Sequence, residues 1–177
     1  FKQTIKFMKQ GVPIIYHGVF HDHENKLYGI PDLLVRSDYV NQLTDGDYIK
    51  NPNIKSIFSK DYHYIVVDIK FSTLKLASDG IHMINDGIVK ASKGQLFIYN
   101  QILGSLQGHK PECAYVLGKK WRYKKNSQLF SGNGCFDRLG VINFADRDFE
   151  YAEKVQLALD WCKEVRENFN QFTLFPP

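Results

Sequence analysis

The residues best suited to chemistry are an acid and a lysine within an apolar stretch. Asp68 and Lys70 stand two positions apart in the run from Tyr62 to Phe71, whose β-branched and aromatic residues predict a strand covered on both faces. Side chains at positions i and i+2 of a strand share a face, so the carboxylate and the ammonium are expected side by side. Because buried charges are costly unless they are paired, the pair indicates a salt bridge or part of a metal site.

A second carboxylate is expected close to this pair. Asp32 follows Pro31 within a second predicted strand, 27–35, which lies next to the first one in the expected sheet. If the two strands pair, Asp32 and Asp68 converge at one edge of that sheet. Two carboxylates form a site for a hard cation, and Mg²⁺ or Mn²⁺ suits them better than a soft metal.

Further ligands and a phosphate contact can be assigned around the two acids. The backbone carbonyl of Ile69 could supply another oxygen, and His17, in the predicted strand 12–20, is the nearest imidazole. His17 is either a ligand or a strand residue that hydrogen-bonds a neighbour. Lys70 would contact a phosphate or position an attacking water. Together these groups predict metal-assisted hydrolysis of a phosphodiester.

Gln95 and Tyr99 lie four residues apart in a predicted helix, 87–106. Residues at this spacing share one helical face. The helix follows the strand of Asp68 and Lys70 at a distance typical of a crossover, so this face is expected beside the two acids.

A basic segment with interleaved aromatic residues follows later in the chain. Its members are Lys119, Lys120, Trp121, Arg122, Tyr123, Lys124 and Lys125. Basic side chains neutralise phosphates and aromatic rings stack on unpaired bases, which favours a nucleic-acid contact. The alternative is a solvated basic edge whose Trp121 packs inward. A third polar cluster, His21, Asp22 and His23, is typical of a solvated turn, with a second metal site as its alternative.

The pattern of the chain predicts an α/β domain. The expected helices are 4–10, 87–106 and 148–169, and the expected strands are 12–20, 27–35, 62–71 and 112–117, with loops at 36–60, 72–86 and 118–138. Three consecutive strands, a crossover helix and one more strand imply a mixed sheet with helices on its faces. The last helix is expected to pack on the core.

Composition narrows the class of protein. The chain has 177 residues, a net charge of +4 and 44% hydrophobic residues, which fits a single globular domain. No apolar run is long enough for a membrane span, and no signal peptide is evident. The chain opens on Phe1 and ends on Pro177, so we interpret it as a domain of a larger protein.

Cysteine usage points to a reducing compartment. Cys113, Cys135 and Cys162 are widely spaced and form no C-x-x-C pair, so neither a zinc finger nor an iron–sulfur cluster is expected. An intracellular protein of the cytoplasm, the nucleus or a viral replication compartment is predicted.

Three of these motifs together resemble the PD-(D/E)XK nuclease superfamily, and within it the RecB-like nucleases. The matching pieces are Gly29-Ile30-Pro31-Asp32, Asp68-Ile69-Lys70 and the Q-x-x-x-Y motif Gln95-Leu96-Phe97-Ile98-Tyr99. The element order is also similar to the restriction-endonuclease-like αβββαβ core of that family. The resemblance covers about residues 1–117, and 118–177 would be an extension with an additional C-terminal helix.

The resemblance implies roles for these residues. Asp32 and Asp68 would bind Mg²⁺ or Mn²⁺, Lys70 would be catalytic, and Gln95 and Tyr99 would support the site and the DNA near it. The expected activity is hydrolysis of single- or double-stranded DNA in replication, recombination or repair, and a linked helicase or another domain of the parent protein is a candidate partner.

One departure from the family keeps two alternatives open. Such nucleases often carry a His or Glu on the first helix, and the segment Phe1–Gln10 has neither. Either the ligand lies upstream of Phe1 or it is absent, and its absence favours a catalytically inactive nucleic-acid-binding module of the same fold. A separate alternative is an RNA endonuclease of the cap-snatching type, a group that also uses P-D and D/E-x-K motifs with a histidine.

Overall fold

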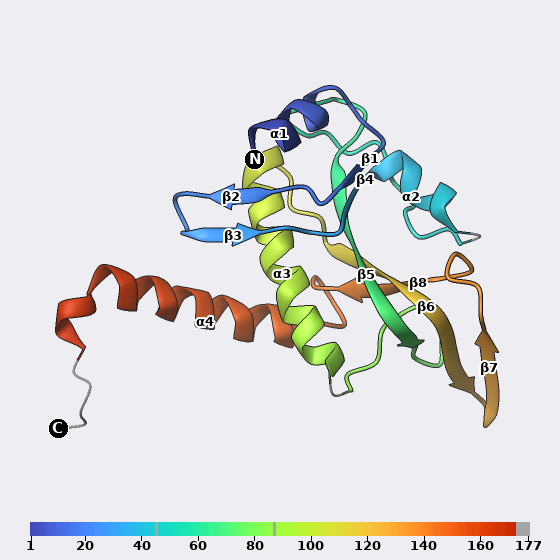
Figure 1. The fold of residues 1–177 in the computed structure, drawn as a ribbon. Coiled ribbons are helices and arrows are strands. Elements are labelled where there is room, and N and C mark those ends of the chain that lie inside the picture. The colour runs from blue at the N-terminus through green and yellow to red at the C-terminus, as the bar shows by residue number, and fades with distance from the viewer. Residues whose placement is uncertain (45, 87, 173–177) are drawn as a thin grey trace.

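The computed structural model describes residues 1–44, 46–86 and 88–172. Within these residues six strands form one mixed sheet in the order β1-β4-β5-β6-β7, with β8 also paired to β6, and helices lie on its faces (Figure 1). The predicted mixed sheet flanked by helices is thus confirmed. In chain order the elements are α1 (Lys2–Lys9), β1 (Ile14–Tyr16), β2 (Phe20–Asp22), β3 (Leu27–Gly29), β4 (Leu33–Arg36), α2 (Ser37–Leu43), β5 (Tyr64–Lys75), α3 (Ile88–Gln107), β6 (Cys113–Lys125), β7 (Gln128–Gly132), β8 (Leu139–Asn143), α4 (Phe149–Glu167) and a 3₁₀ turn (Phe169–Gln171).

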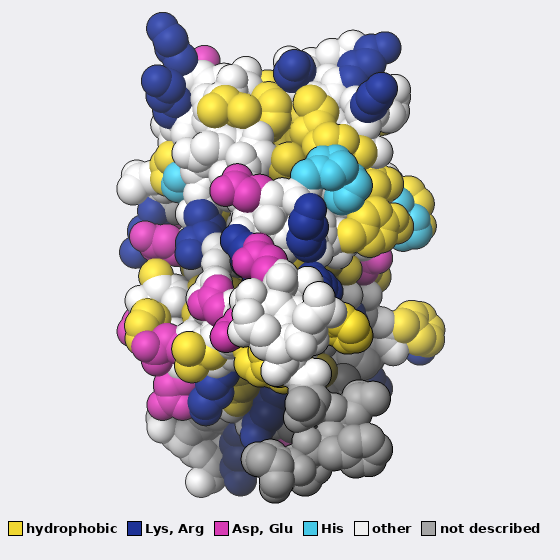
Figure 2. Space-filling model, turned by 90° about the vertical axis from the view of Figure 1, so that its left-hand side faces the viewer, with side chains coloured by type: hydrophobic (Ala, Val, Ile, Leu, Met, Phe, Trp, Pro, Cys, Tyr) yellow, Lys and Arg dark blue, Asp and Glu magenta, His cyan; other side chains and the backbone are white. Residues whose placement is uncertain are grey.

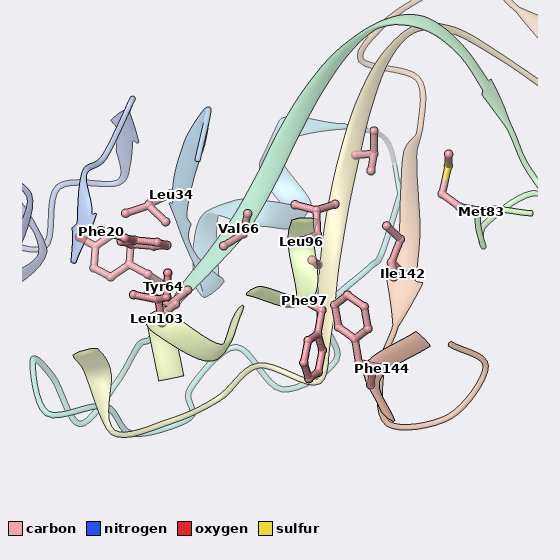
Figure 3. Close-up of a cluster of buried hydrophobic side chains, with 14 of the residues drawn as sticks. Phe20, Leu34, Tyr64, Val66, Met83, Leu96, Phe97, Leu103, Ile142 and Phe144 are labelled. Atoms are coloured by element: carbon pink, nitrogen blue, oxygen red, sulfur yellow. The ribbon is translucent and has the colours of Figure 1, made fainter. Parts of the chain in front are cut away.

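Strand β5 is the central strand, as its apolar sequence predicts. It pairs antiparallel with β4 on one side and parallel with β6 on the other, and α3 makes the crossover. Tyr64 and Val66 pack toward α3, and Figure 3 shows them in one cluster with Leu96 and Leu103 of that helix. The alternate residues of β5 belong to a second cluster on the opposite face. Burial on both faces explains why this stretch lacks a polar and apolar alternation.

The two strands predicted before β5 are each broken in the middle. The segment 12–20 divides into β1 and β2, and the segment 27–35 divides into β3 and β4. β1 pairs with β4, while β2 and β3 form a separate antiparallel pair. His17 has a φ of 49°, outside the range of a strand, and Pro31 has no N–H to donate to a ladder. Asp32 consequently lies in the break before β4 rather than in the middle of a strand.

Regular structure also extends into segments predicted as loops. Helix α2 lies within 36–60, and β5 continues through 72–75. The segment 118–138, predicted to be irregular, instead contains the second half of β6 and all of β7, which pair antiparallel. In β6 the half-buried Trp121 and Tyr123 alternate with exposed basic residues, a pattern typical of a strand that the prediction of an irregular segment overlooked. Strand β8 was not predicted at all.

The two long helices lie at the positions predicted from the sequence. Gly87, the first residue of the predicted helix 87–106, lies outside the described residues, and α3 runs to Gln107. Helix α4 extends away from the body of the molecule (Figure 1), and Ala152 is its buried residue. The rest of its apolar stripe is half-buried, so the prediction of a core helix is wrong for most of its length. None of the described helices is long and apolar enough to span a membrane.

A buried histidine sits at the start of β5. His63 is 3% exposed, its ring contacts that of His109 at 4.6 Å between centroids, and its Nδ1 has no hydrogen-bond partner among the described residues. Burial, with a smaller contribution from His109, lowers the pKa of His63 from 6.5 to about 4. The folded protein therefore holds this imidazole neutral over a pH range in which the unfolded chain protonates it.

Acidification is expected to destabilise the protein through His63. Because the folded pKa lies below the unfolded one, the contribution of His63 is complete above pH 6.5 and falls by about 3 kcal/mol as the pH drops to about 4. Urea denaturation between pH 4 and 7 should show a shallower pH dependence for His63→Gln than for the wild type. His23→Gln, which changes an exposed histidine, should keep the wild-type slope. Equal slopes for wild type and His63→Gln would contradict this assignment.

Candidate active site

Asp32 joins the start of β4 to the middle of β5. Its Oδ2 accepts a hydrogen bond from the backbone N–H of Ile69 at 2.7 Å, and its backbone oxygen accepts one from the N–H of His17 at 2.9 Å. The ladder between the two strands ends at the pair Leu33 and Val67. The side chain of Asp32 therefore binds the backbone of β5 just beyond the point where the pairing of β5 with β4 ends.

Asp68 is the buried member of the acidic pair. The residue is 2% exposed, and Lys70 Nζ lies 2.7 Å from its Oδ2. The buried Oδ2 is contacted by the Lys70 ammonium and has no other donor among the described residues. Burial raises the pKa of Asp68, the nearby Asp32 carboxyl raises it further, and Lys70 opposes both. The two carboxylates are thus close enough to influence one another.

Lys70, Gln95 and Tyr99 form a continuous chain of contacts between β5 and α3. Lys70 Nζ donates to Gln95 Oε1 at 3.4 Å, and Gln95 Nε2 donates to the Tyr99 hydroxyl at 2.9 Å. That hydroxyl donates in turn to the carbonyl of Ile30 at 3.5 Å, just before Asp32. Gly29 permits this arrangement, because a Cβ there would lie 2.5 Å from the Tyr99 ring. The five residues predicted from three separate motifs therefore meet in one place.

The two additional ligand candidates lie beside these residues. His17 Nε2 is 3.7 Å from Asp32 Oδ1, and its ring stacks on Tyr16. Its left-handed backbone is rare for a residue other than glycine and is often found at functional sites. Ile69 lies between the two acids and is 44% exposed. Its N–H is bound by Asp32, while a ligand role for its carbonyl stays a prediction.

The set of candidate metal ligands is small, but its chemistry fits a hard divalent cation. Within the described residues no group of three or more His, Cys, Asp or Glu side chains is arranged to hold a metal. What the site offers is the buried Asp68 carboxylate and the neighbouring Asp32 carboxylate. Carboxylate oxygens are the ligands that Mg²⁺ and Mn²⁺ prefer, and water usually completes their coordination. A cation bound by these carboxylates would offset the charge of the buried Asp68, which Lys70 alone contacts in the ion pair.

The basic segment begins next to the acids and runs away from them along β6. Gly118 pairs with Lys70, and the five cationic side chains that follow on β6 are exposed. The interleaved aromatic rings are already engaged, since Trp121 Nε1 donates to Asp137 and Tyr123 stacks on Phe130 at 4.9 Å. The cations are thus available for phosphates, whereas Trp121 and Tyr123 are not free to stack on bases.

One exposed aromatic residue near the acids was not singled out from the sequence. Phe71 directly follows Lys70 and is 86% exposed. The apolar run 62–71 gives no indication of where burial ends, because its sequence is equally apolar before and after Asp68. The pairing of β5 with β4 ends at Val67, and the sequence does not indicate this position.

The cluster His21, Asp22 and His23 does not converge on one point. The two imidazole rings lie 3.8 Å apart, whereas Asp22 is buried and accepts hydrogen bonds from Asn25. Figure 2 shows histidine side chains next to hydrophobic ones on the face toward which the β2–β3 pair points. This cluster therefore lacks the three-ligand arrangement of a metal site.

A large groove of the described residues lies away from the acids. This groove of about 940 Å³ between α3 and the start of α4 is lined by Phe97, Phe144, Phe149 and other residues, none of them from the acidic cluster. Volume alone would favour this groove as a binding site. We place the candidate active site at the acids instead, because paired carboxylates and a lysine provide chemistry that the groove does not.

Comparison with known proteins adds no assignment. No model of a protein family and no curated protein matches this chain. The case for a function therefore rests on the geometry of the site and on the resemblance of its motifs.

Proposed function

We propose that this protein is a divalent-metal-dependent nuclease that hydrolyses phosphodiester bonds of DNA. The observation that carries the proposal is the meeting of Asp32, Asp68 and Lys70 at the open end of the β4–β5 ladder. We further propose that α1, the strands β1 and β4 to β6, and α3 correspond to a restriction-endonuclease-like core of the RecB-like type.

Each residue of the chain has a distinct role in this proposal. Asp32 and Asp68 hold Mg²⁺ or Mn²⁺. A bound divalent cation would polarise a phosphoryl oxygen and offset the charge of the leaving group. Lys70, whose side chain is 34% exposed, contacts the scissile phosphate or orients the attacking water. Gln95 and Tyr99 position Lys70 through the hydrogen bonds that link α3 to β5.

The proposal is tested by cleavage of labelled DNA with Mn²⁺, Mg²⁺ or EDTA. Cleavage should require the metal, and Asp32→Asn should slow it by about a thousandfold, because several kcal/mol of charge stabilisation would be lost. Asp61→Asn is the matched control, since Asp61 is exposed on the loop before β5. Metal-independent cleavage, or full activity in Asp32→Asn, would refute the proposal.

A second candidate is a non-catalytic nucleic-acid-binding module of the same fold. It is favoured by the absence of a third metal-binding side chain within the described residues and by the exposed cations of β6. Such a module would bind DNA in EDTA with a steep salt dependence and would not cleave it. Cleavage restricted to RNA would instead indicate an RNA endonuclease.

A further inference from the structure

The most exposed large hydrophobic side chain of the described residues lies next to the candidate active site. Phe71 is 86% exposed and follows Lys70 directly on β5. Consecutive side chains of a strand project to opposite faces, so a polynucleotide would contact both Lys70 and Phe71 by passing the edge of β5 that β4 leaves open beyond Val67. Single exposed apolar residues are common on protein surfaces, and the position of this one therefore needs independent support.

The backbone of β5 is irregular at Phe71. The pairing with β6 is regular up to Lys70 and Gly118 and resumes at Thr73 and Lys120, so β5 has one extra residue in this interval. Such a bulge redirects a side chain, and bulges are frequent beside active sites. Beyond Val67 no described strand pairs with β5 on the side of β4. Phe71 therefore lies in an irregular stretch of β5 whose edge on the side of β4 is open to a ligand.

A lysine accompanies the exposed ring. Lys119 Nζ lies 4.3 Å from the centroid of the Phe71 ring, in a cation–π contact. The high exposure of Phe71 means that at least one face of its ring remains open to solvent. A planar aromatic group could stack on that face while the ammonium contacts a phosphate of the same nucleotide. Lys119 also begins the exposed cations of β6, which continue away from the acids.

We propose that Phe71 and Lys119 form a subsite that stacks one unpaired base beside Lys70, and that the preferred ligand is single-stranded DNA. This inference rests on the proposed function and specifies its substrate. Bases within a duplex are already stacked on each other and cannot lie on Phe71, whereas an unpaired base can. The basic side chains of β6 would hold the phosphates on either side without regard to sequence.

Binding measured in EDTA tests the subsite without cleavage. A single-stranded oligonucleotide carrying 2-aminopurine should be bound by the wild type with quenching of its fluorescence. Phe71→Ala should weaken binding roughly 5- to 150-fold and abolish the quenching, while Phe71→Tyr should retain both. Phe169→Ala is the matched control, because Phe169 is 73% exposed and lies beyond α4 (Figure 1). Thermal denaturation should be the same for all four proteins.

The outcomes separate the subsite from the nuclease. Unchanged binding in Phe71→Ala would overturn the subsite, and so would an equal loss of duplex and single-strand binding. Stronger Phe71-dependent binding of single-stranded RNA would overturn the assignment to DNA. Phe71-dependent binding without any metal-dependent cleavage would support the subsite and refute the nuclease. Metal-dependent cleavage that does not depend on Phe71 would support the nuclease and refute the subsite.

Discussion

Replacing Lys93 by methionine is expected to lower the free energy of unfolding by about 3–5 kcal/mol. Lys93 and Asp148 are both fully buried and form an ion pair. Lys93 Nζ also donates to the carbonyl of Met83 at 3.1 Å and to Asn85 Oδ1 at 2.5 Å. Without the ammonium, the carboxylate of Asp148 would remain buried and uncompensated.

The large expected loss of stability follows from the position of the Lys93–Asp148 ion pair. The second oxygen of Asp148 accepts a hydrogen bond from the N–H of Asn143 at 2.9 Å, so the pair joins α3 to the end of β8 and the start of α4. Urea denaturation at neutral pH measures the effect. Lys154→Met is the control, since its ion pair with Glu150 is exposed and should contribute less than about 1 kcal/mol.

A double variant distinguishes loss of pairing from loss of packing. Lys93→Met combined with Asp148→Asn removes both charges, and it should be less destabilised than the sum of the two single variants. Strict additivity, or a loss below about 1 kcal/mol in Lys93→Met, would show that the pair does not stabilise the fold as described.

The candidate site could be predicted because each of its parts is coded locally. The two-residue period of a strand places Asp68 beside Lys70, and the helical period places Gln95 beside Tyr99. The crossover helix between parallel strands then brings these two pairs together. Only Asp32 required a non-local assumption, the pairing of β4 with β5, and that pairing is present.

The features that sequence reasoning missed depend on distant contacts or on polar patterns. Lys93 has the sequence environment of a surface lysine, and its partner Asp148 lies 55 positions away. The second half of β6 and all of β7 pair with each other, and the short alternation of Trp121 and Tyr123 with basic residues was the one local sign of a strand there. Helix α4 has an apolar stripe that predicts core packing, yet the body of the protein covers only its beginning.

Replacing Asp68 by asparagine is expected to abolish cleavage without weakening the fold. Loss of one of the two carboxylates should reduce the rate by at least about a thousandfold, as for Asp32. The free energy of unfolding in EDTA should instead stay constant or rise by about 0.5–2 kcal/mol, the range typical of single stabilising substitutions. The reason is that burial and the neighbouring Asp32 disfavour the ionised form of Asp68, as its raised pKa indicates.

The opposite signs of the two effects make this variant informative. If Asp68 were only the acidic half of a structural salt bridge with Lys70, its replacement would leave activity intact and destabilise the protein. If Asp68 is a buried metal ligand whose burial and whose neighbour Asp32 outweigh the contact with Lys70, its charge costs stability in the absence of a cation, and the neutral amide removes that cost. Adding Mg²⁺ or Mn²⁺ should accordingly raise the melting temperature of the wild type and leave that of Asp68→Asn nearly unchanged, because only the wild type retains both carboxylates to bind the ion.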